Sequence, residues 1–356
     1  MKAVILAGGK GTRLRPLTLH TPKPIVPILD RPFLSFQIDL LRRSGISEII
    51  LSLSYQPRHI EEIFGDGGDL GVKILYTMEA EPLGTAGAVK KAEPFLTHRT
   101  VVLNGDVLCD VELGSVFAEH ERAGAKATIV LTPVENPSAY GLVETDASGR
   151  VRRFLEKPSY DEITCDTINA GIYVLEPELL SLIPQDTNYS FERGVFPTLL
   201  RENIPFSAFV HRGYWIDIGT PEKYLKVHQD LLRGAFQWSP DSAPARAGVH
   251  VHQEASVDPG AELSGPAFIG AGAVVKSGAH IKPFAVVGKN CRVEEGALVE
   301  NSVLWSNVRV GAEARVRGAL IGRNAHIGRN ARVDGGVVLG DKSVVADYSR
   351  LGQEMG

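Results

Sequence analysis

Hydrophobic residues in the first 230 positions follow two spacings in turn, which predicts strands that alternate with helices. Short apolar runs at Val4–Ala7, Glu48–Leu53 and Thr100–Leu103 have the length of buried strands, whereas Phe33–Ser44 repeats its apolar residues as a helix does. The same patterns predict a strand at Val72–Tyr76 and helices at Pro57–Phe64 and Ala86–Ala92. This alternation implies a mostly parallel sheet with both faces covered. Ligands of such sheets bind beyond the carboxyl ends of the strands, so the segments that follow Ala7 and Leu103 are candidate sites.

A period of six begins after residue 250. Aliphatic residues recur every six positions from Val257 to Val299, and the phase slips by one residue before Leu304 and again before Ile321, from where it continues to Val345. Neither a helix nor a flat strand has this period. A hexapeptide β-helix does, because each six-residue side of its triangular coil points one aliphatic residue inward. Chance is the alternative, but so many matches with only two slips argue against it, and they predict about five coils.

The turn-rich stretch from Trp238 to Ala245 separates these two patterns. We therefore predict an α/β fold of two domains. A Rossmann-like domain with a mixed, mostly parallel sheet spans residues 1–235, a linker spans 236–248, and a left-handed parallel β-helix of hexapeptide repeats spans 249–350.

Composition narrows the possible functions. The formal net charge of −4 gives no basic surplus for nucleic acid, so phosphate binding would depend on local basic residues. The three cysteines, Cys109, Cys165 and Cys291, lie far apart without a CxxC spacing, which favours a reducing compartment over disulfides or zinc. No apolar run is long enough for a signal peptide core or a membrane span. We expect a cytoplasmic protein that binds neither nucleic acid nor membrane.

The first candidate site is the glycine-rich segment that follows the first strand. Gly8, Gly9 and Gly11 allow the backbone to approach a ligand and to point its N–H groups at phosphate oxygens. Arg13 adds a positive charge for a triphosphate. A Rossmann fingerprint is excluded because Leu14 stands where its third glycine belongs, and a Walker A motif is excluded because no Gly-Lys-Ser/Thr occurs here. A plain glycine-rich turn is the alternative.

Three further charged residues stand out. Lys23 lies between two prolines, whose stiff backbone would hold a point charge against phosphate. The alternative is a lysine in a surface loop without a functional role. Asp106 and Asp217 are each embedded in apolar sequence, which is costly unless something compensates the carboxylate. Meeting at a sheet edge, the two would suit Mg²⁺ bound between them and nucleotide phosphates. Each alone could equally be a cap or turn residue.

Two more segments place polar groups in apolar surroundings. Glu156 and Lys157 are adjacent, and in an extended strand their side chains face opposite ways, so both reach a ligand only near the strand's end. Asn169 interrupts an apolar run, and a buried asparagine needs hydrogen-bond partners. The hydroxyl groups of a sugar would serve, as would the backbone.

Together these segments resemble one known family. LAGGKGTRLRPLT, TPKP, EPLGTAGA, LNGD, FLEKP, NAGIY and YWIDIGTPEKY occur in the order, and at about the spacing, of the sugar nucleotidyltransferases, also called nucleoside-diphospho-sugar pyrophosphorylases. The resemblance covers residues 1 to about 233, and many members of the family carry a hexapeptide β-helix. Each motif alone is weak, and the set is specific.

The resemblance implies a role for each matching residue. Nucleotide-binding positions are Leu6, Gly8, Gly9, Gly11, Thr12 and Gly84, the last in the base-recognition loop. The basic residues at the phosphates, taken as catalytic, are Arg13 and Lys23. Sugar-phosphate positions are Gly141, Glu156, Lys157 and Asn169. The Mg²⁺ ligands are Asp106 and Asp217.

The implied reaction joins a nucleoside triphosphate to a sugar 1-phosphate and releases pyrophosphate. Stretches such as VENPSAYGLVETDASGRVRRFLEKP are most similar to the mannose-1-phosphate guanylyltransferases of the family, which implies GTP and mannose 1-phosphate. A thymidylyl or uridylyl transfer to glucose 1-phosphate, or a guanylyl transfer to a heptose phosphate, stays open.

Two other classes of function are weighed against this one. The first is a non-catalytic regulator that binds nucleotide sugars, which the retained basic and acidic residues disfavour. The second is an acyltransferase, because hexapeptide β-helices often bind acyl-CoA; its candidate bases are His250, His252, His280 and His326. The short β-helix, without a long protruding loop, argues against it. We expect the β-helix to build a homo-oligomer, most simply a dimer.

Overall fold

The computed structural model describes residues 1–238 and 248–353. The chain forms two compact units. The first unit comprises Met1–Lys10 and Leu34–Asp217, and the second comprises Gly11–Phe33 and Ile218–Gly356. The domain boundaries drawn from the sequence stay a prediction, and residues 239–247 of the predicted linker lie outside the described part.

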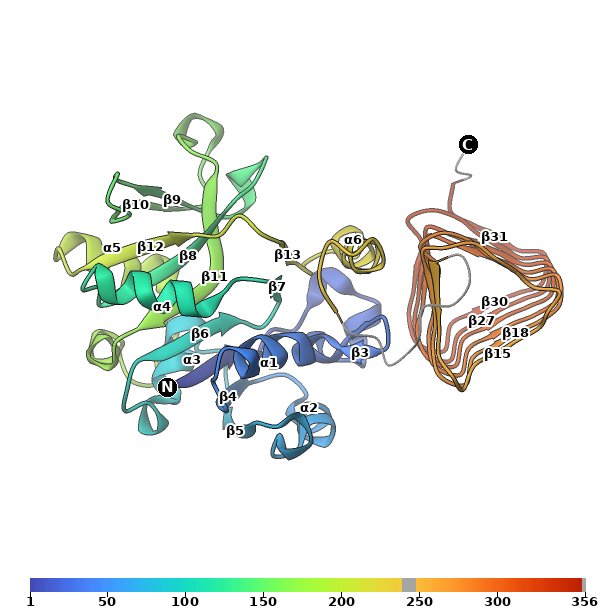
Figure 1. The fold of residues 1–356 in the computed structure, drawn as a ribbon, viewed down its shortest axis with the longest axis horizontal. Coiled ribbons are helices and arrows are strands. Elements are labelled where there is room, and N and C mark those ends of the chain that lie inside the picture. The colour runs from blue at the N-terminus through green and yellow to red at the C-terminus, as the bar shows by residue number, and fades with distance from the viewer. Residues whose placement is uncertain (239–247, 354–356) are drawn as a thin grey trace. The chain divides into compact units, whose positions relative to one another are not determined.

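The centre of the first unit is a parallel sheet, as the alternation of strands and helices predicts. Its strands run in the order β6-β1-β4-β5, and every neighbouring pair among them is parallel. The strands are β1 (Lys2–Leu6), β4 (Glu48–Leu53), β5 (Lys73–Met78) and β6 (Thr100–Asn104). The helices of this part are α1 (Phe33–Arg43), α2 (Pro57–Phe64), α3 (Gly84–Lys91) and α4 (Leu113–Arg122), and they lie beside the sheet in Figure 1.

The sheet continues beyond β6 with antiparallel strands, so that it is mixed as expected. The long strand β11 (Thr167–Leu175) runs antiparallel to β6 and also pairs with β8 and β9. The remaining elements here are β8 (Ala127–Pro133), β9 (Gly141–Thr145), β10 (Val151–Glu156), β12 (Phe206–Val210) and α5 (Phe196–Arg201). A separate two-stranded ladder joins β7 (Val107–Cys109) to β13 (Trp215–Asp217).

An aromatic cluster packs against this mixed region. The ring of Phe196 lies 5.3 Å from Tyr173, 5.6 Å from Phe191 and 5.1 Å from Phe206, centroid to centroid. All four side chains are buried, and such ring pairs add to the stabilisation from area alone. The cluster fixes β11, β12 and α5 against one another, and β11 is the strand that carries Asn169.

In the second unit, the period of six gives three parallel sheets, the arrangement of a left-handed parallel β-helix (Figure 1). One sheet contains β14 (Val249–Val251), β17 (Ala267–Ile269), β20 (Val286–Val287), β23 (Val303–Leu304), β26 (Leu320–Ile321) and β29 (Val338–Leu339). The second contains β15 (Ser256–Val257), β18 (Val274–Val275), β21 (Arg292–Val293), β24 (Arg309–Val310), β27 (His326–Ile327) and β30 (Val344–Val345). The third contains β16 (Glu262–Leu263), β19 (His280–Ile281), β22 (Leu298–Glu300), β25 (Arg315–Arg317), β28 (Arg332–Val333) and β31 (Arg350–Leu351).

The interior of the β-helix is formed by the aliphatic residues of the period. From Ile269 to Val333 these residues are almost completely buried and form one hydrophobic cluster. Each sheet has six strands within the described residues, so the β-helix has six coils rather than about five. The phase slips shorten individual coils: Val275 lies beside Val293, but Val293 lies beside Val310, one residue nearer along the chain.

One outer face of the β-helix is apolar. Phe268, Val286, Val303 and Leu320 project outward from consecutive strands of the first sheet, and all four are buried. We call these four residues the apolar face. Helix α6 (Pro221–Leu232) and the residues after it supply partners along this side of the β-helix. Their contacts include Gln229 with Asn301, Arg233 over the ring of Phe284, and Trp238 against Phe268.

In the described part of the chain, no helix has both the length and the apolar composition that crossing a bilayer requires.

Candidate active site

The glycine-rich segment is divided between the two units, and its first half follows β1. Ser54 donates a hydrogen bond from its hydroxyl to the carbonyl oxygen of Gly8. The backbone N–H of Gly105 donates to the carbonyl oxygen of Leu6 at 3.0 Å. A Cβ atom on residue 105 would lie 2.5 Å from that oxygen, so only glycine permits this approach. The approach fixes the start of the glycine-rich segment beside the backbone that leads into Asp106.

The second half of the segment belongs to the second unit and forms a tight turn. Gly11 has a φ of 60°, a left-handed conformation that favours glycine, and its carbonyl oxygen accepts a hydrogen bond from the Thr18 hydroxyl at 2.7 Å. A short 3₁₀ helix, Thr12–Leu14, follows and leaves the Arg13 side chain exposed. A Cβ on residue 11 would lie 3.1 Å from Cβ of Lys23, so the turn packs directly on that lysine. Lys23 is only 8% exposed.

The two candidate metal ligands come from the β7–β13 ladder of the first unit. Asp217 lies directly opposite Val107, the residue after Asp106, so the register brings the two aspartates to one end of the ladder. Both are half-buried, and Asp217 accepts a hydrogen bond from the Tyr140 hydroxyl at 3.0 Å. The ring of Tyr140 meets Trp215 edge-on at 5.6 Å. Carboxylate oxygens are the donors that Mg²⁺ prefers, so this pair fits a hard divalent cation.

The candidate sugar-phosphate residues Gly141, Glu156 and Lys157 meet across the β9–β10 pair. Gly141 lies opposite Glu156, and a Cβ on residue 141 would lie 2.7 Å from the Phe154 ring and 3.2 Å from the Glu156 carboxylate. Lys157 ends the strand with a φ of 53°, which strains a lysine, while its N–H donates to the Tyr140 carbonyl at 2.9 Å. The lysine side chain is exposed at the strand end, as its candidate role requires.

Burial raises the pKa of the Glu156 carboxyl, and the negative charge of Glu192 raises it further; Lys157 and Arg193 act in the opposite direction. Asn169 is satisfied within the protein. Its amide oxygen accepts from the N–H of Gly171, and its amide nitrogen donates to the Tyr173 hydroxyl, both at 2.9 Å. Both ends of this amide therefore have a hydrogen-bond partner within β11.

The base-recognition candidate Gly84 opens α3 and is held by a distant segment. Its φ is 71°, and a Cβ there would lie 2.7 Å from the carbonyl oxygen of Tyr189. The N–H of Tyr189 donates to the Leu83 carbonyl at 2.8 Å. Glu79, which the sequence analysis missed, accepts from the N–H of Leu83 at 2.8 Å and from the Ser52 hydroxyl at 2.9 Å. The loop is therefore fixed from both sides through its backbone.

Glu192 is a second residue that sequence reasoning missed. Its carboxylate accepts from the hydroxyls of Thr85 at 2.9 Å, Ser190 and Tyr173. Through Tyr173 it connects to Asn169, and through Thr85 to the first turn of α3. The one signal in the sequence was a glutamate two residues after a serine at a helix start, an arrangement that is common at ordinary helix N-termini.

Cys109, Asp110 and His211 form the one group in the described residues with the spacing of metal ligands. The His211 Nε2 atom lies 2.9 Å from the Asp110 carboxylate, a hydrogen-bonding distance that accounts for both side chains. Burial raises the pKa of the Cys109 thiol to about 12, so this group is an ordinary buried thiol beside a His–Asp pair.

Comparison with known proteins agrees with this layout. The family model described as nucleotidyl transferase matches residues 2–234, which is more than half of the chain. The chain belongs to this family. A second model, described as the GMPPB C-terminal domain, matches residues 263–355, a range that includes the β-helix strands from β17 to β31.

This nucleotidyl transferase is similar in sequence to several enzymes and to a solved structure. Mannose-1-phosphate guanylyltransferase from Mycobacterium tuberculosis is 41% identical, covering 84% of this chain and 82% of that protein. UTP–glucose-1-phosphate uridylyltransferase from Synechocystis is 37% identical, covering 86% and 83%. Among solved structures, HddC from Yersinia pseudotuberculosis is 33% identical with a TM-score of 0.57, covering 65% of this chain and 99% of that chain; another of its structures contains GMP-PN.

Family membership confirms the expected class of enzyme and, with the sheets above, the expected fold. Nucleotidyltransferases of this family generally use a divalent metal. The individual residue roles stay predictions.

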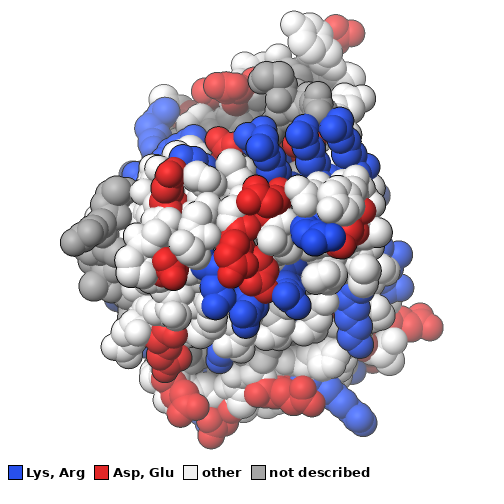
Figure 2. Space-filling view, turned by 90° about the vertical axis from the view of Figure 1, so that its right-hand side faces the viewer, with Lys and Arg blue, Asp and Glu red and all other residues white. Residues whose placement is uncertain are grey.

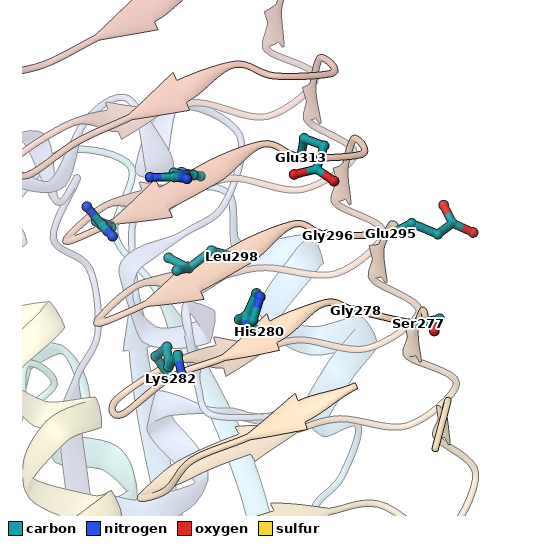
Figure 3. A pocket seen from close by; sticks show the side chains of 10 residues that line it. Ser277, Gly278, His280, Lys282, Glu295, Gly296, Leu298 and Glu313 are labelled. Atoms are coloured by element: carbon teal, nitrogen blue, oxygen red, sulfur yellow. The ribbon is translucent and has the colours of Figure 1, made fainter. Parts of the chain in front are cut away.

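The β-helix of this nucleotidyl transferase has an open groove of about 770 Å³. Figure 3 shows His280, Lys282 and Leu298 on neighbouring coils, with Glu295 and Glu313 at the adjacent corner. The candidate acyltransferase histidines do not meet there. His250, His280 and His326 project from three different sheets, and His280 is paired with Glu262 at 2.8 Å.

Proposed function

We propose that this nucleotidyl transferase forms GDP-mannose and pyrophosphate from GTP and mannose 1-phosphate. The observation that supports this pair best is the joint match of both parts of the chain. Over 82–85% of its length the chain is 36–41% identical to mannose-1-phosphate guanylyltransferases from bacteria and eukaryotes, and the β-helix matches a C-terminal domain model of its own. UTP with glucose 1-phosphate is the second candidate, because the Synechocystis uridylyltransferase is nearly as similar.

The loop at Gly84 is where we expect the base to be chosen. Its backbone is fixed by Glu79 on one side and Tyr189 on the other, so the N–H and C=O groups that it would present to a base are preorganised. A fixed hydrogen-bonding edge discriminates strongly between bases, because a wrong base leaves buried polar groups unpaired.

The reaction itself needs positioning more than covalent help. An oxygen of the sugar 1-phosphate forms a bond to the α-phosphorus of the triphosphate, and the bond from that phosphorus to the pyrophosphate oxygen breaks. In the proposal, Lys157 holds the sugar's phosphate, while Arg13 and Lys23 neutralise the triphosphate and the departing pyrophosphate. Leu6, Gly8, Gly9, Gly11 and Thr12 supply backbone around the nucleotide.

Asp106 and Asp217 are the proposed ligands of a Mg²⁺ ion. Bound there, the ion would neutralise phosphate charge and stabilise the developing charge on the oxygens. The hydroxyl of Tyr140 would orient Asp217 by donating a hydrogen bond to one of its carboxylate oxygens. Gly141, Glu156 and Asn169 would contact the sugar. A cytoplasmic location is part of the same proposal.

The direct test is pyrophosphate release with Mg²⁺, across GTP, dTTP, UTP, ATP and CTP against mannose 1-phosphate and glucose 1-phosphate. We expect the highest kcat/KM for GTP with mannose 1-phosphate, by at least about tenfold over any other pair. A maximum at UTP with glucose 1-phosphate would favour the second candidate. Activity with no pair would contradict both.

We also propose that the chain forms a homo-oligomer through the charged faces of its β-helix. Figure 2 shows blue and red side chains close together on this side of the molecule. Arg292 and Arg309, on the second sheet, both contact Glu294, and the groove along the third sheet is lined by both signs of charge. A surface with both signs can pair with a second copy of itself about a two-fold axis.

Light scattering of the full chain tests this assembly. We expect a dimer mass at micromolar concentration and a monomer mass for Arg315→Glu, which reverses a charge in the groove. A monomer mass for the wild type at every concentration would contradict the proposal. The full chain is the right sample, because cutting at residue 235 would remove Trp305, the partner of buried Tyr224.

A further inference from the structure

A side chain of the β-helix contacts the segment that carries Lys23. Nη1 of Arg323 donates a hydrogen bond of 2.6 Å to the Thr21 hydroxyl oxygen, across 302 positions of sequence. Both residues belong to the second compact unit, and Thr21 is 1% exposed. Thr21 stands two residues before Lys23 in Thr-Pro-Lys-Pro. A charge-assisted hydrogen bond in a buried place is a strong constraint on backbone position.

Arg323 is itself held in place. Its guanidinium lies over the ring of Trp305 at 5.1 Å from the centroid, and its backbone N–H donates to the carboxylate of Asp341 at 2.7 Å. Trp305 is 1% exposed and donates its indole N–H to the Tyr224 hydroxyl at 2.9 Å. A guanidinium stacked on a fully packed indole has little freedom to leave its partner.

The same network reaches the other end of the segment. The Tyr224 hydroxyl donates to the carbonyl oxygen of Pro27. Between these two anchors the backbone makes a single 3₁₀ turn, in which Ile25 donates to the Pro22 carbonyl at 3.0 Å and Val26 to the Lys23 carbonyl at 3.2 Å. The segment is thus held at Thr21 by Arg323 and at Pro27 by Tyr224.

We propose that Arg323 is a positioning residue for Lys23, so that the β-helix sets the geometry of the basic residue at the phosphates. This inference rests on the proposed function, which places Lys23 against the triphosphate. Lys23 also packs on Gly11, so a displaced Thr21–Pro27 segment would disturb the glycine-rich turn as well. A displacement of about 1 Å in such a group costs up to ~100-fold in rate, even when its origin is far from the chemistry.

The test compares Arg323→Ala, Thr21→Val and their double variant. We expect each single variant to lower kcat roughly tenfold with KM for both substrates changed less than about twofold. Both changes remove the same hydrogen bond, so the double variant should be no slower than the slower single variant. Arg323→Lys, which can still donate to Thr21, should recover part of the lost rate.

The chain offers a matched control at Arg329, six residues on. Its backbone N–H donates to the Asp347 carboxylate at 2.8 Å, and its guanidinium lies over the Tyr348 ring at 5.6 Å from the centroid. Arg329 thus has the same two kinds of contact as Arg323, on the next side of the triangular coil. No contact of Arg329 with the Thr21–Pro27 segment is present in the described structure. Arg329→Ala should therefore leave kcat within about twofold of the wild type, as a general effect on the coil would not.

Hydrogen exchange of the protein without substrates separates this inference from the proposed function. Arg323→Ala should speed the exchange of the Ile25 and Val26 amides about tenfold, while Arg329→Ala should not. An active wild type with unchanged kcat in Arg323→Ala, or additive losses in the double variant, would overturn the inference alone. Unchanged amide exchange in Arg323→Ala would overturn the inference whether or not the wild type is active. Inactivity of the wild type would contradict the proposed function but would leave the exchange test in place.

Discussion

Asp217→Ala is expected to lower kcat by about 1,000-fold or more while leaving the fold intact. The half-buried carboxylate lies at the end of the β7–β13 ladder, where Asp217 is opposite Val107, the residue after Asp106. Losing one of two charged ligands should weaken the metal site, and metal-ion stabilisation of phosphate charge is worth several kcal/mol. The measurements are pyrophosphate release at saturating substrates and Mn²⁺ binding followed by paramagnetic resonance in the presence of nucleotide.

Two matched variants make this prediction specific to the charge. Asp217→Asn keeps the shape and an acceptor for Tyr140, so it should fold like the wild type and still lose at least about 100-fold in kcat and most Mn²⁺ binding. Tyr140→Phe removes only the orienting hydroxyl and should cost roughly tenfold. Asp217→Asn with more than about a tenth of wild-type kcat, or with unchanged Mn²⁺ binding, would show that Asp217 is not a ligand.

Local signals explain why parts of the fold could be predicted to the residue. The strand Glu48–Leu53 and the helix Pro57–Phe64 have the predicted bounds, because Pro57 starts the helix and Gly65 ends it. Directions within the sheet are different. Strand β11 is buried along most of its length, and a continuously apolar strand does not reveal whether its neighbours are parallel or antiparallel.

The β-helix shows the same limit at its ends. Val251 and Leu351 each continue the period by one step, at the two ends of the β-helix. Along the sequence, each has another aliphatic residue of the period six positions away on one side only. A periodic pattern is weakest where it stops, so the count from sequence fell one coil short. The slips in phase were visible, and the pairing shows that they shorten coils without breaking the stack.

The candidate site residues could be predicted where they lie in a short sequence motif. Gly8 and Gly11, which were predicted, have close contacts or a left-handed conformation that a side chain would disturb. Glu79 and Glu192 were missed because Ser52 and Thr85, a partner of each, are 27 and 107 residues away along the chain, and only tertiary structure brings them together. For Asn169 the sequence leaves open whether a sugar or the backbone provides its partners, and within β11 its partners are the backbone of Gly171 and the Tyr173 hydroxyl.

Trp305→Ala is the second large effect that we expect, now on stability. Trp305 is among the largest fully buried side chains, and its removal leaves a cavity and an unsupported Arg323. Truncating a buried tryptophan costs about 3–5 kcal/mol. Trp305→Phe keeps a ring beneath the guanidinium and should cost less than half as much. Denaturation by guanidinium chloride, followed by circular dichroism, measures both.

The assay that gives this prediction its meaning is activity along the same denaturant series. Gly11–Phe33 belongs to the compact unit that contains the β-helix, and Tyr224 joins Trp305 to Pro27 within it. Unfolding of that unit should therefore release Arg13 and Lys23, and activity in Trp305→Ala should disappear at the denaturant concentration where the β-sheet signal of the β-helix is lost. Activity that outlasts this signal would mean that the loop keeps its geometry without the β-helix, and would contradict the bracing of Lys23 through Arg323 and Tyr224.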